Sequence, residues 1–229
     1  MTSERFPHLF SPLTIRGVTL KNRILSTGHE TALVDRGRLG DAFLAYHEAR
    51  ARGGAGLIIS EVASVHPSGI FVRDPIPVYN DDCIPDYRRL AKMLHGHGAA
   101  FFAQLFHPGR EIVETFDGSA PVSYAPSASP NERFHIMPRP MPLDLIEEVI
   151  AGYVAAAARM EEAGTDGVEI VASHGYLPAQ FLNPRVNRRD DAYGGSAENR
   201  LRFLSEIASG IRARVGDGFV VGLRISAEE

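Results

Sequence analysis

Short apolar runs alternate along this chain with segments of helical periodicity. Five runs are suited to parallel strands that are covered on both faces, and they span residues 23–27, 56–60, 99–105, 168–171 and 219–225. Between them, apolar residues recur at i, i+3, i+4 and i+7, the spacing of one helix face, in residues 87–94, 146–157 and 204–211. The alternation predicts repeated βα units in an α/β fold.

Glycines stand between the predicted helices and the strands that follow them. They are Gly53 and Gly54, Gly96 and Gly98, Gly164, and Gly216. Glycine tolerates the left-handed conformation that closes a helix, so these joins favour βα units. His95 and His97 lie at one such end, where we expect them to cap carbonyls and the helix dipole instead of binding metal. A long polar connection follows the fourth strand, and a helix is expected to begin near Ser196.

Two segments lie outside the alternation. The stretch LTIRGVTLKNR predicts a short hairpin around Gly17 that crosses the floor of a barrel. Residues 117–142 are rich in proline and lack periodicity, so we expect a long loop of the kind that forms lids or binding segments. Gly54-Ala55-Gly56 resembles part of a dinucleotide fingerprint, but it precedes a strand instead of following one, so we assign no such loop.

Composition narrows the classes of function. The 229 residues carry a net charge of −4 with no basic patch, which favours neither nucleic acid nor an anionic membrane as a partner. The single cysteine, Cys83, allows no disulfide and no protein-held iron–sulfur cluster within the chain. Neither a secretion signal nor a membrane span is found, so a reducing cytoplasm is the expected location.

Each predicted strand leads into residues with hydrogen-bonding or charged side chains. In chain order these are Ser26, Thr27, Gly28, His29 and Glu30; Glu61; Gln104 and His107; His174 and Tyr176; and Arg224 and Ser226. The carboxyl ends of parallel strands open at one mouth, so we expect a rim of polar groups around a ligand. Taken singly, Gln104 could satisfy backbone groups and His107 could cap a turn. Arg224 could pair with Glu61.

Four longer motifs carry a family resemblance. They are LFSPLTIRGVTLKNRI, FAQLFHPGR (102–110), HGYLPAQFLNP (174–184) and NRRDDAYGGSAENRLRF (187–203). Over essentially the whole chain, the sequence resembles the old yellow enzyme family, the NADH:flavin oxidoreductases. The resemblance implies an eight-stranded (β/α) TIM barrel with FMN across its carboxyl-terminal mouth. We expect residues 1–229 to be the N-terminal part of that domain, a hairpin and about five βα units truncated after strand five, and to bind FMN weakly or not at all alone.

The resemblance also implies roles for individual residues. The cofactor-binding set comprises Ser26, Thr27, Gly28, Val62, Gln104 and Arg224. Gln104 matches the amide at the pyrimidine edge of the flavin, and Arg224 matches the cation beside the ring nitrogen that becomes anionic on reduction. His174 and Tyr176 match the catalytic pair that faces the substrate. No metal site is implied, and an iron–sulfur cluster is expected only in residues beyond this chain.

The departures from the family pattern favour one branch of it. Many ene-reductases of the family hold a substrate carbonyl with a donor at the position of Val171, and valine cannot donate. The HET segment and HGYLPAQFLNP resemble the trimethylamine dehydrogenase and N-demethylase branch. Glu30 stands where trimethylamine dehydrogenase has a cysteine linked to its flavin, so FMN is expected to be held non-covalently. Glu30, Val171 and His174 form the expected substrate-binding set.

These expectations lead to a ranked set of functions. The first is oxidative N-demethylation, in which hydride leaves an N-methyl carbon for FMN and Glu30 attracts the cationic amine. The second is reduction of an activated C=C bond, as in 2,4-dienoyl-CoA reductase, with Tyr176 as the acid. A non-catalytic scaffold and an aldolase barrel rank lower. NAD(P)H is open as electron partner, the substrate is a small molecule, and a homo-oligomer of the full-length protein stays open.

Overall fold

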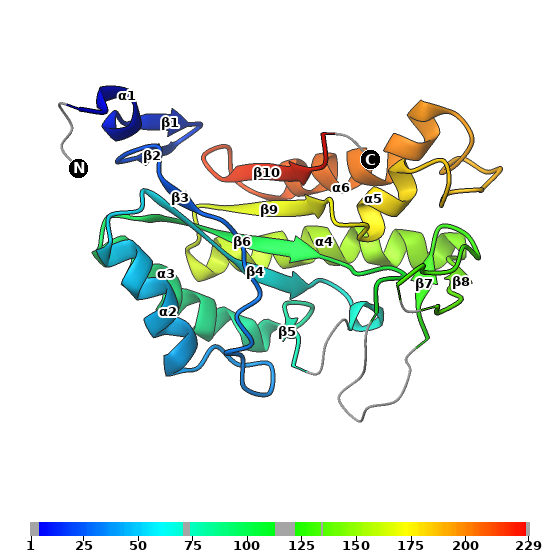
Figure 1. Cartoon of the computed structure of the whole chain (residues 1–229), viewed down its shortest axis with the longest axis horizontal. Helices are drawn as coiled ribbons and strands as arrows, with labels where there is room; N and C mark the ends of the chain where they lie inside the picture. The colour runs from blue at the N-terminus through cyan, green and yellow to red at the C-terminus, as the bar shows by residue number, and fades with distance from the viewer. Residues whose placement is uncertain (1–4, 71–73, 113–121, 134, 228–229) are drawn as a thin grey trace.

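Five parallel strands form the centre of the fold. The computed structural model describes residues 5–70, 74–112, 122–133 and 135–227, and it shows these strands side by side (Figure 1). Their order is β10 (Val220–Ile225), β9 (Gly167–Ala172), β6 (Ala100–Phe106), β4 (Leu57–Ser64) and β3 (Leu25–Ser26). A sixth short strand, β5 (Ile76–Pro77), pairs with the end of β4. The five predicted strands are confirmed, and their parallel order is that of an incomplete (β/α) barrel.

An N-terminal hairpin covers the inner face of the sheet at the amino-terminal ends of the strands. After α1 (Pro7–Phe10), strands β1 (Leu13–Ile15) and β2 (Val18–Leu20) pair antiparallel, and Figure 1 shows them at the end of the sheet where β9 and β10 begin. Leu20 joins an apolar cluster with residues from three central strands, which are Leu57, Ile59, Phe102 and Val220. The predicted hairpin therefore lies where a barrel floor is expected.

Four long helices cover the outer face of the sheet. They are α2 (Asp41–Arg52), α3 (Ile84–Gly96), α4 (Leu143–Ala163) and α6 (Ala197–Arg214). Fully buried residues of these helices, such as Phe43, Leu90 and Tyr153, share one apolar cluster with Ile58 of β4. Its neighbour Leu57 belongs to the inner cluster instead. Successive residues of a strand point to opposite faces, and here both faces are apolar, which explains the continuous apolar runs.

The helix ends agree with the glycine pattern at three joins and differ at the fourth. Gly54, Gly98 and Gly164 have φ of +100°, +66° and +85°, in the left-handed region. Gly216 does not close α6, because the helix ends at Arg214 and the next residue, Val215, is already extended. The Arg212 side chain instead donates to the carbonyls of Val215, Gly216 and Phe219. A basic side chain in the last turn thus holds the loop that joins α6 to β10.

The histidines at the end of α3 bind carboxylates, so the expected capping of carbonyls by their rings is wrong. His95 Nε2 lies 2.7 Å from Asp166 Oδ2, and His97 Nε2 lies 3.1 Å from Glu48 Oε1. Both contacts join α3 to neighbouring elements. Among the described residues there is no cluster of three or more histidine, cysteine or acidic side chains suited to a metal ion.

Several short elements were not predicted. The proline-rich segment contains β7 (Tyr124–Ala125) and β8 (Arg139–Pro140), which pair with each other; residues 113–121 and 134 lie outside the described part. The polar connection contains α5 (Leu177–Leu182), whose six residues are too few for periodicity to reveal. Two 3-10 turns, η1 (Pro67–Gly69) and η2 (Asp81–Cys83), precede β5 and α3.

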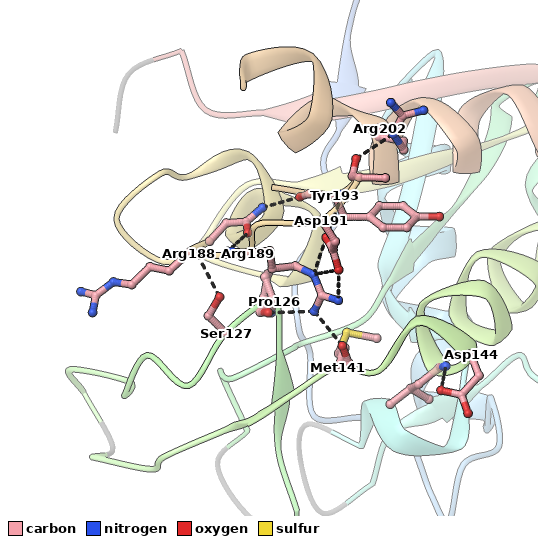
Figure 2. Close-up of polar contacts among 12 residues, drawn as sticks. Pro126, Ser127, Met141, Asp144, Arg188, Arg189, Asp191, Tyr193 and Arg202 are labelled. Carbon is pink, nitrogen blue, oxygen red and sulfur yellow. Dashed lines mark hydrogen bonds and ion pairs between the residues drawn. The ribbon is translucent and has the colours of Figure 1, made fainter. Parts of the chain in front are cut away.

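Arg189 fastens the β7–β8 segment to the connection before α6 (Figure 2). Its Nη1 donates to the carbonyls of Pro126 at 3.0 Å and Met141 at 2.7 Å, one at each end of the segment. Its Nη2 lies 2.6 Å from Asp191 Oδ2. Ser196 caps α6 by accepting from the Asn199 N–H, as predicted from the sequence. In the described part of the chain, no helix is both long enough and apolar enough to cross a bilayer.

Candidate functional site

A cavity of about 310 Å³ opens among the carboxyl ends of the central strands. Its lining residues are Thr27, Gly28, His29, Glu30, Val62, Gln104, Val171, His174, Tyr176 and Arg224. Every residue of the expected cofactor-binding, catalytic and substrate-binding sets is here except Ser26, which lies in β3 just before the lining begins. Five separate strands therefore contribute to one site, as the strand-end pattern predicted.

The register of the sheet places the lining residues on its inner face. Val62 of β4 pairs with Gln104 of β6, and Val171 of β9 pairs with Arg224 of β10. Residues in register on parallel neighbours project to the same side, so these four side chains point inward together. The floor cluster lies two to four residues earlier on three of these strands, at Ile59, Phe102 and Val220. The site consequently lies directly above a packed apolar floor.

The Gln104 amide is held from two sides. Its Nε2 donates to Glu169 Oε1 at 2.6 Å, and Glu169 is its register partner on β9. On the other side, a Cβ on Gly28 would lie 2.7 Å from three atoms of the amide group. Only glycine allows the backbone to come this close. Gln104 thus bonds a side chain, whereas the structural alternative considered from the sequence was a bond to backbone.

Arg224 faces the cavity with one long hydrogen bond. Its Nη1 lies 3.5 Å from the Gly28 carbonyl oxygen, which is the outer limit for such a contact. The suggested pairing of Arg224 with Glu61 is wrong, because the Glu61 carboxylate accepts from the backbone N–H of Thr31 at 2.8 Å and from its hydroxyl. Burial raises the pKa of Glu61. The guanidinium of Arg224 therefore supplies positive charge to the cavity.

Two left-handed residues turn the chain sharply after β9. His174 has φ of +59° and Gly175 has φ of +70°. A left-handed conformation is unfavourable for a residue with a Cβ, and strained residues of this kind cluster at functional sites. The turn stacks the rings of His174 and Tyr176, whose centroids are 5.9 Å apart. Ser173 Oγ lies 2.7 Å from His174 Nδ1, and this hydrogen bond fixes the orientation of the imidazole ring.

Tyr176 is kept in its neutral form by its surroundings. Burial raises the pKa of Tyr176 to about 12, and the negative charges of Glu30 and Glu111 contribute to the rise. Its ring meets Phe106 edge to face at 5.2 Å between centroids. A neutral phenol at pH 7 can donate a hydrogen bond or a proton. Burial also raises the pKa of Glu30, although His29 opposes the rise.

Three of the predicted rim residues do not reach the cavity. Glu61 lies within β4, which extends to Ser64, and a register shift between Ile59 and Val62 turns its side chain toward Thr31. His107 is fully buried, and its Nδ1 accepts from the Gly109 N–H, so the structural explanation for it is confirmed. Ser226 instead lines a second cavity of about 410 Å³ beside α5.

Two residues belong to the wall of the site although the sequence assigned them no role, and His29, expected only on the rim, lines the cavity. Glu169 holds Gln104, and a Cβ on Gly175 would lie 3.5 Å from Glu111 Oε1. Glu169 had a readable signal, since it is the one charged residue in the apolar strand GVEIVA and shares the alternation of Val171. Glu111 lies in a loop and has no such signal.

The sequence and the fold both have close counterparts among known proteins. A sequence profile of the NADH:flavin oxidoreductase / NADH oxidase family matches residues 8–229. Over 98% of its own length, the chain is 39% identical to an NADH oxidase of Thermoanaerobacter brockii. Over the same share of its length, it is 37% identical to an N,N-dimethylglycine/sarcosine dehydrogenase of Chromohalobacter salexigens. It superposes on morphinone reductase in complex with tetrahydroNAD with a TM-score of 0.86 at 32% identity, over 96% of the chain.

The chain spans only part of each of these proteins. It covers 35% of the NADH oxidase, 33% of the dimethylglycine/sarcosine dehydrogenase and 64% of the morphinone reductase chain. The family profile nevertheless matches almost every residue of the chain, and the parallel sheet with its outer helices agrees with the predicted partial TIM barrel. The chain therefore belongs to the NADH:flavin oxidoreductase / NADH oxidase family.

Proposed function

We propose that the protein containing this chain is an FMN-dependent oxidoreductase that oxidises N-methylated amines. The observation that carries the proposal is the convergence of Gln104, Arg224, Glu30 and the His174–Tyr176 pair on one cavity whose fourth strand contributes Val171. The first two suit a flavin, and the others suit a cationic substrate above it. Valine at 171 leaves no donor at that position for a substrate carbonyl.

The residues present fit the polar edge and the faces of a flavin ring. Val62 and Val171 offer apolar contact, and the Gln104 amide retains an acceptor and a donor beyond its bond to Glu169. Gly28 has no side chain to fill the space beside that amide. Arg224 provides a positive charge of the kind that stabilises an anionic ring. When bound, FMN would supply the two-electron acceptor that these side chains cannot provide.

The remaining side chains bind and orient the substrate. The Glu30 carboxylate at the cavity attracts an ammonium group, and His174 Nε2 is left for the substrate because Ser173 engages Nδ1. Neutral Tyr176 donates a hydrogen bond. The overall conversion takes an N-methyl amine and water to the demethylated amine and formaldehyde, with release of two electrons and two protons. The named activity of the Chromohalobacter salexigens relative supports this substrate class.

A second candidate is reduction of an activated C=C bond. The likeness to morphinone reductase favours it, as does the raised pKa of Tyr176, because a neutral phenol can protonate the carbon next to a carbonyl. Val171 argues against it. We rank it below amine oxidation for that reason, and we propose NAD(P)H as the electron partner for this direction of reaction. Either activity is proposed for the cytoplasm, where the lone Cys83 would stay reduced.

The test uses the full-length protein loaded with FMN. Under anaerobic conditions, N-methylated amino acids and simple N-methylamines should bleach the oxidised flavin and release one formaldehyde per turnover. Flavin that stays oxidised across the whole panel rejects amine oxidation. In the reverse arm, reoxidation of the reduced protein by enones or dienoyl-CoA would identify the second candidate instead. Glu30→Gln should raise KM for the amine with little change in KM for an enone, because only the amine is cationic.

A further inference from the structure

We propose that Glu169 fixes the orientation of the Gln104 amide and holds the reduction potential of the bound flavin below the value that Arg224 alone would set. The inference rests on the proposed FMN site and concerns its tuning. Glu169 has no assigned role in the function proposed above.

The contact between the two side chains determines which way the amide faces. A carboxylate can only accept hydrogen bonds, so the group 2.6 Å from Glu169 Oε1 has to be the NH₂ end of Gln104. The carbonyl oxygen Oε1 and the second N–H are then the groups left for a ligand. Rotation of the amide would bring two oxygens together and is excluded while the carboxylate is charged. Gly28 packs against the same amide and limits its movement further.

In the described part of the chain, the Glu169 carboxylate forms no ion pair with a neighbouring cation. Its register partner on β10 is Gly222, which has no side chain. Two positions further along, on the same face of the sheet, Val171 pairs with Arg224. The inner face of β9 and β10 therefore carries one anion and one cation close to the same cavity.

Two opposite charges near a flavin act oppositely on its reduction. A fixed positive charge stabilises the anionic reduced ring and raises the potential, and a fixed negative charge destabilises it and lowers the potential. In a partly buried site these effects are not screened as they are at the surface. The hydrogen bond from Gln104 Nε2 to Glu169 also polarises the Gln104 amide. A charged acceptor increases the partial negative charge on the carbonyl oxygen of that amide. Glu169 thus opposes Arg224.

The experiment measures the midpoint potential of the FMN-loaded, full-length protein by anaerobic titration against a reference dye. Glu169→Gln removes the charge with almost no change of shape. This variant should bind reduced FMN about tenfold more tightly relative to oxidised FMN. For a two-electron couple, that change moves the midpoint potential by about 30 mV to a more positive value. Glu206→Gln is the matched control. Glu206 lies on α6 and accepts a hydrogen bond from the Tyr193 hydroxyl at 2.8 Å, so this variant also removes a hydrogen-bonded carboxylate, and it should leave the potential unchanged.

A second variant separates charge from shape. Glu169→Asp keeps the charge and shortens the side chain, so its potential should stay near that of the wild type. An unchanged potential in Glu169→Gln, or an equal shift in Glu169→Asp, overturns this inference and leaves the proposed FMN site standing. Failure of the wild-type protein to take up FMN overturns both.

Discussion

The Ser173 hydroxyl lies 2.7 Å from Nδ1 of His174, at the point where the chain leaves β9 in a left-handed turn. Ser173 is almost fully buried, whereas His174 is exposed toward the cavity. The bond fixes the rotation of the imidazole and leaves Nε2 as the nitrogen that can meet a substrate. The turn by itself would bring the ring to the cavity without setting its direction.

Ser173→Ala should therefore lower kcat/KM for the preferred substrate by about fivefold, the equivalent of one lost hydrogen bond of about 1 kcal/mol. Steady-state kinetics on the full-length protein measures the effect. Ser123→Ala is the matched control, because Ser123 is also buried and, within the described residues, its hydroxyl has no hydrogen-bond partner. Equal losses in the two variants would mean that Ser173 acts only through packing.

Tyr176→Phe tests the role of the neutral phenol. Loss of an acid that protonates substrate carbon should slow C=C reduction by about a hundredfold, whereas amine oxidation, in which the phenol only orients the substrate, should slow far less. The pKa of Tyr176 is raised to about 12, so the phenol stays protonated as the pH rises and the wild-type rate should not fall on its account up to about pH 10. A rate that declines below pH 9 in the wild type but not in Tyr176→Phe contradicts this. Tyr46→Phe on α2 is the control.

Gly28→Ala should weaken FMN binding at least tenfold. The new Cβ would lie 2.7 Å from the Gln104 amide atoms and has to displace them. The dissociation constant, measured by flavin fluorescence in the full-length protein, reports the effect. Gly40→Ala makes the same change where nothing lies within 4 Å of the new Cβ, and it should leave FMN affinity unaltered. Wild-type affinity in Gly28→Ala would remove Gly28 from the cofactor site.

Arg189→Lys should destabilise the protein by about 2 kcal/mol, because lysine keeps the charge but loses the fork that reaches the carbonyls of Pro126 and Met141. Equilibrium denaturation of the full-length protein measures the change. Arg189 holds the pKa of Asp191 below its ordinary value. A lowered carboxyl pKa contributes stability above the unfolded pKa and loses it as pH falls through the folded pKa, so the effect of the variant should shrink at strongly acid pH.

Arg188→Lys is the control for that measurement. The Arg188 side chain is exposed and points away from the network in Figure 2, and its hydrogen bond from Nε to the Arg185 carbonyl is long at 3.4 Å. Its replacement should change the free energy of unfolding by less than about 0.5 kcal/mol. A larger loss of unfolding free energy in Arg188→Lys than in Arg189→Lys would show that the Arg189 contacts do not stabilise the protein.

The sequence contained the order of the central strands and most of the site for a physical reason. Parallel strands covered on both faces must be apolar throughout, so polar groups can begin only where a strand leaves the core, and those strand ends face one mouth. Gln104, Tyr176 and Arg224 were found in this way. Their contacts were not, because a partner such as Glu169 is set by register between strands 65 positions apart.

Other features depended on tertiary contacts that no local pattern encodes. The register shift in β4 turns Glu61 away from the rim, and a single irregular position of this kind leaves no mark in an apolar run. The end of α6 depends on where the Arg212 side chain reaches. The roles assigned to the cavity residues stay predictions until the variants above are measured.

The contact between Arg224 and the Gly28 carbonyl joins residues 196 positions apart, and the floor cluster likewise links β2 to β10. Contacts of such long range are formed late, because the entropy of closing the intervening chain is lost before they stabilise anything. During synthesis, neither the floor nor the cavity above it can assemble before β10 has left the ribosome. Until then only the hairpin covers the apolar inner faces of β4 and β6, and exposed apolar surface of this kind makes a partly folded chain prone to aggregation.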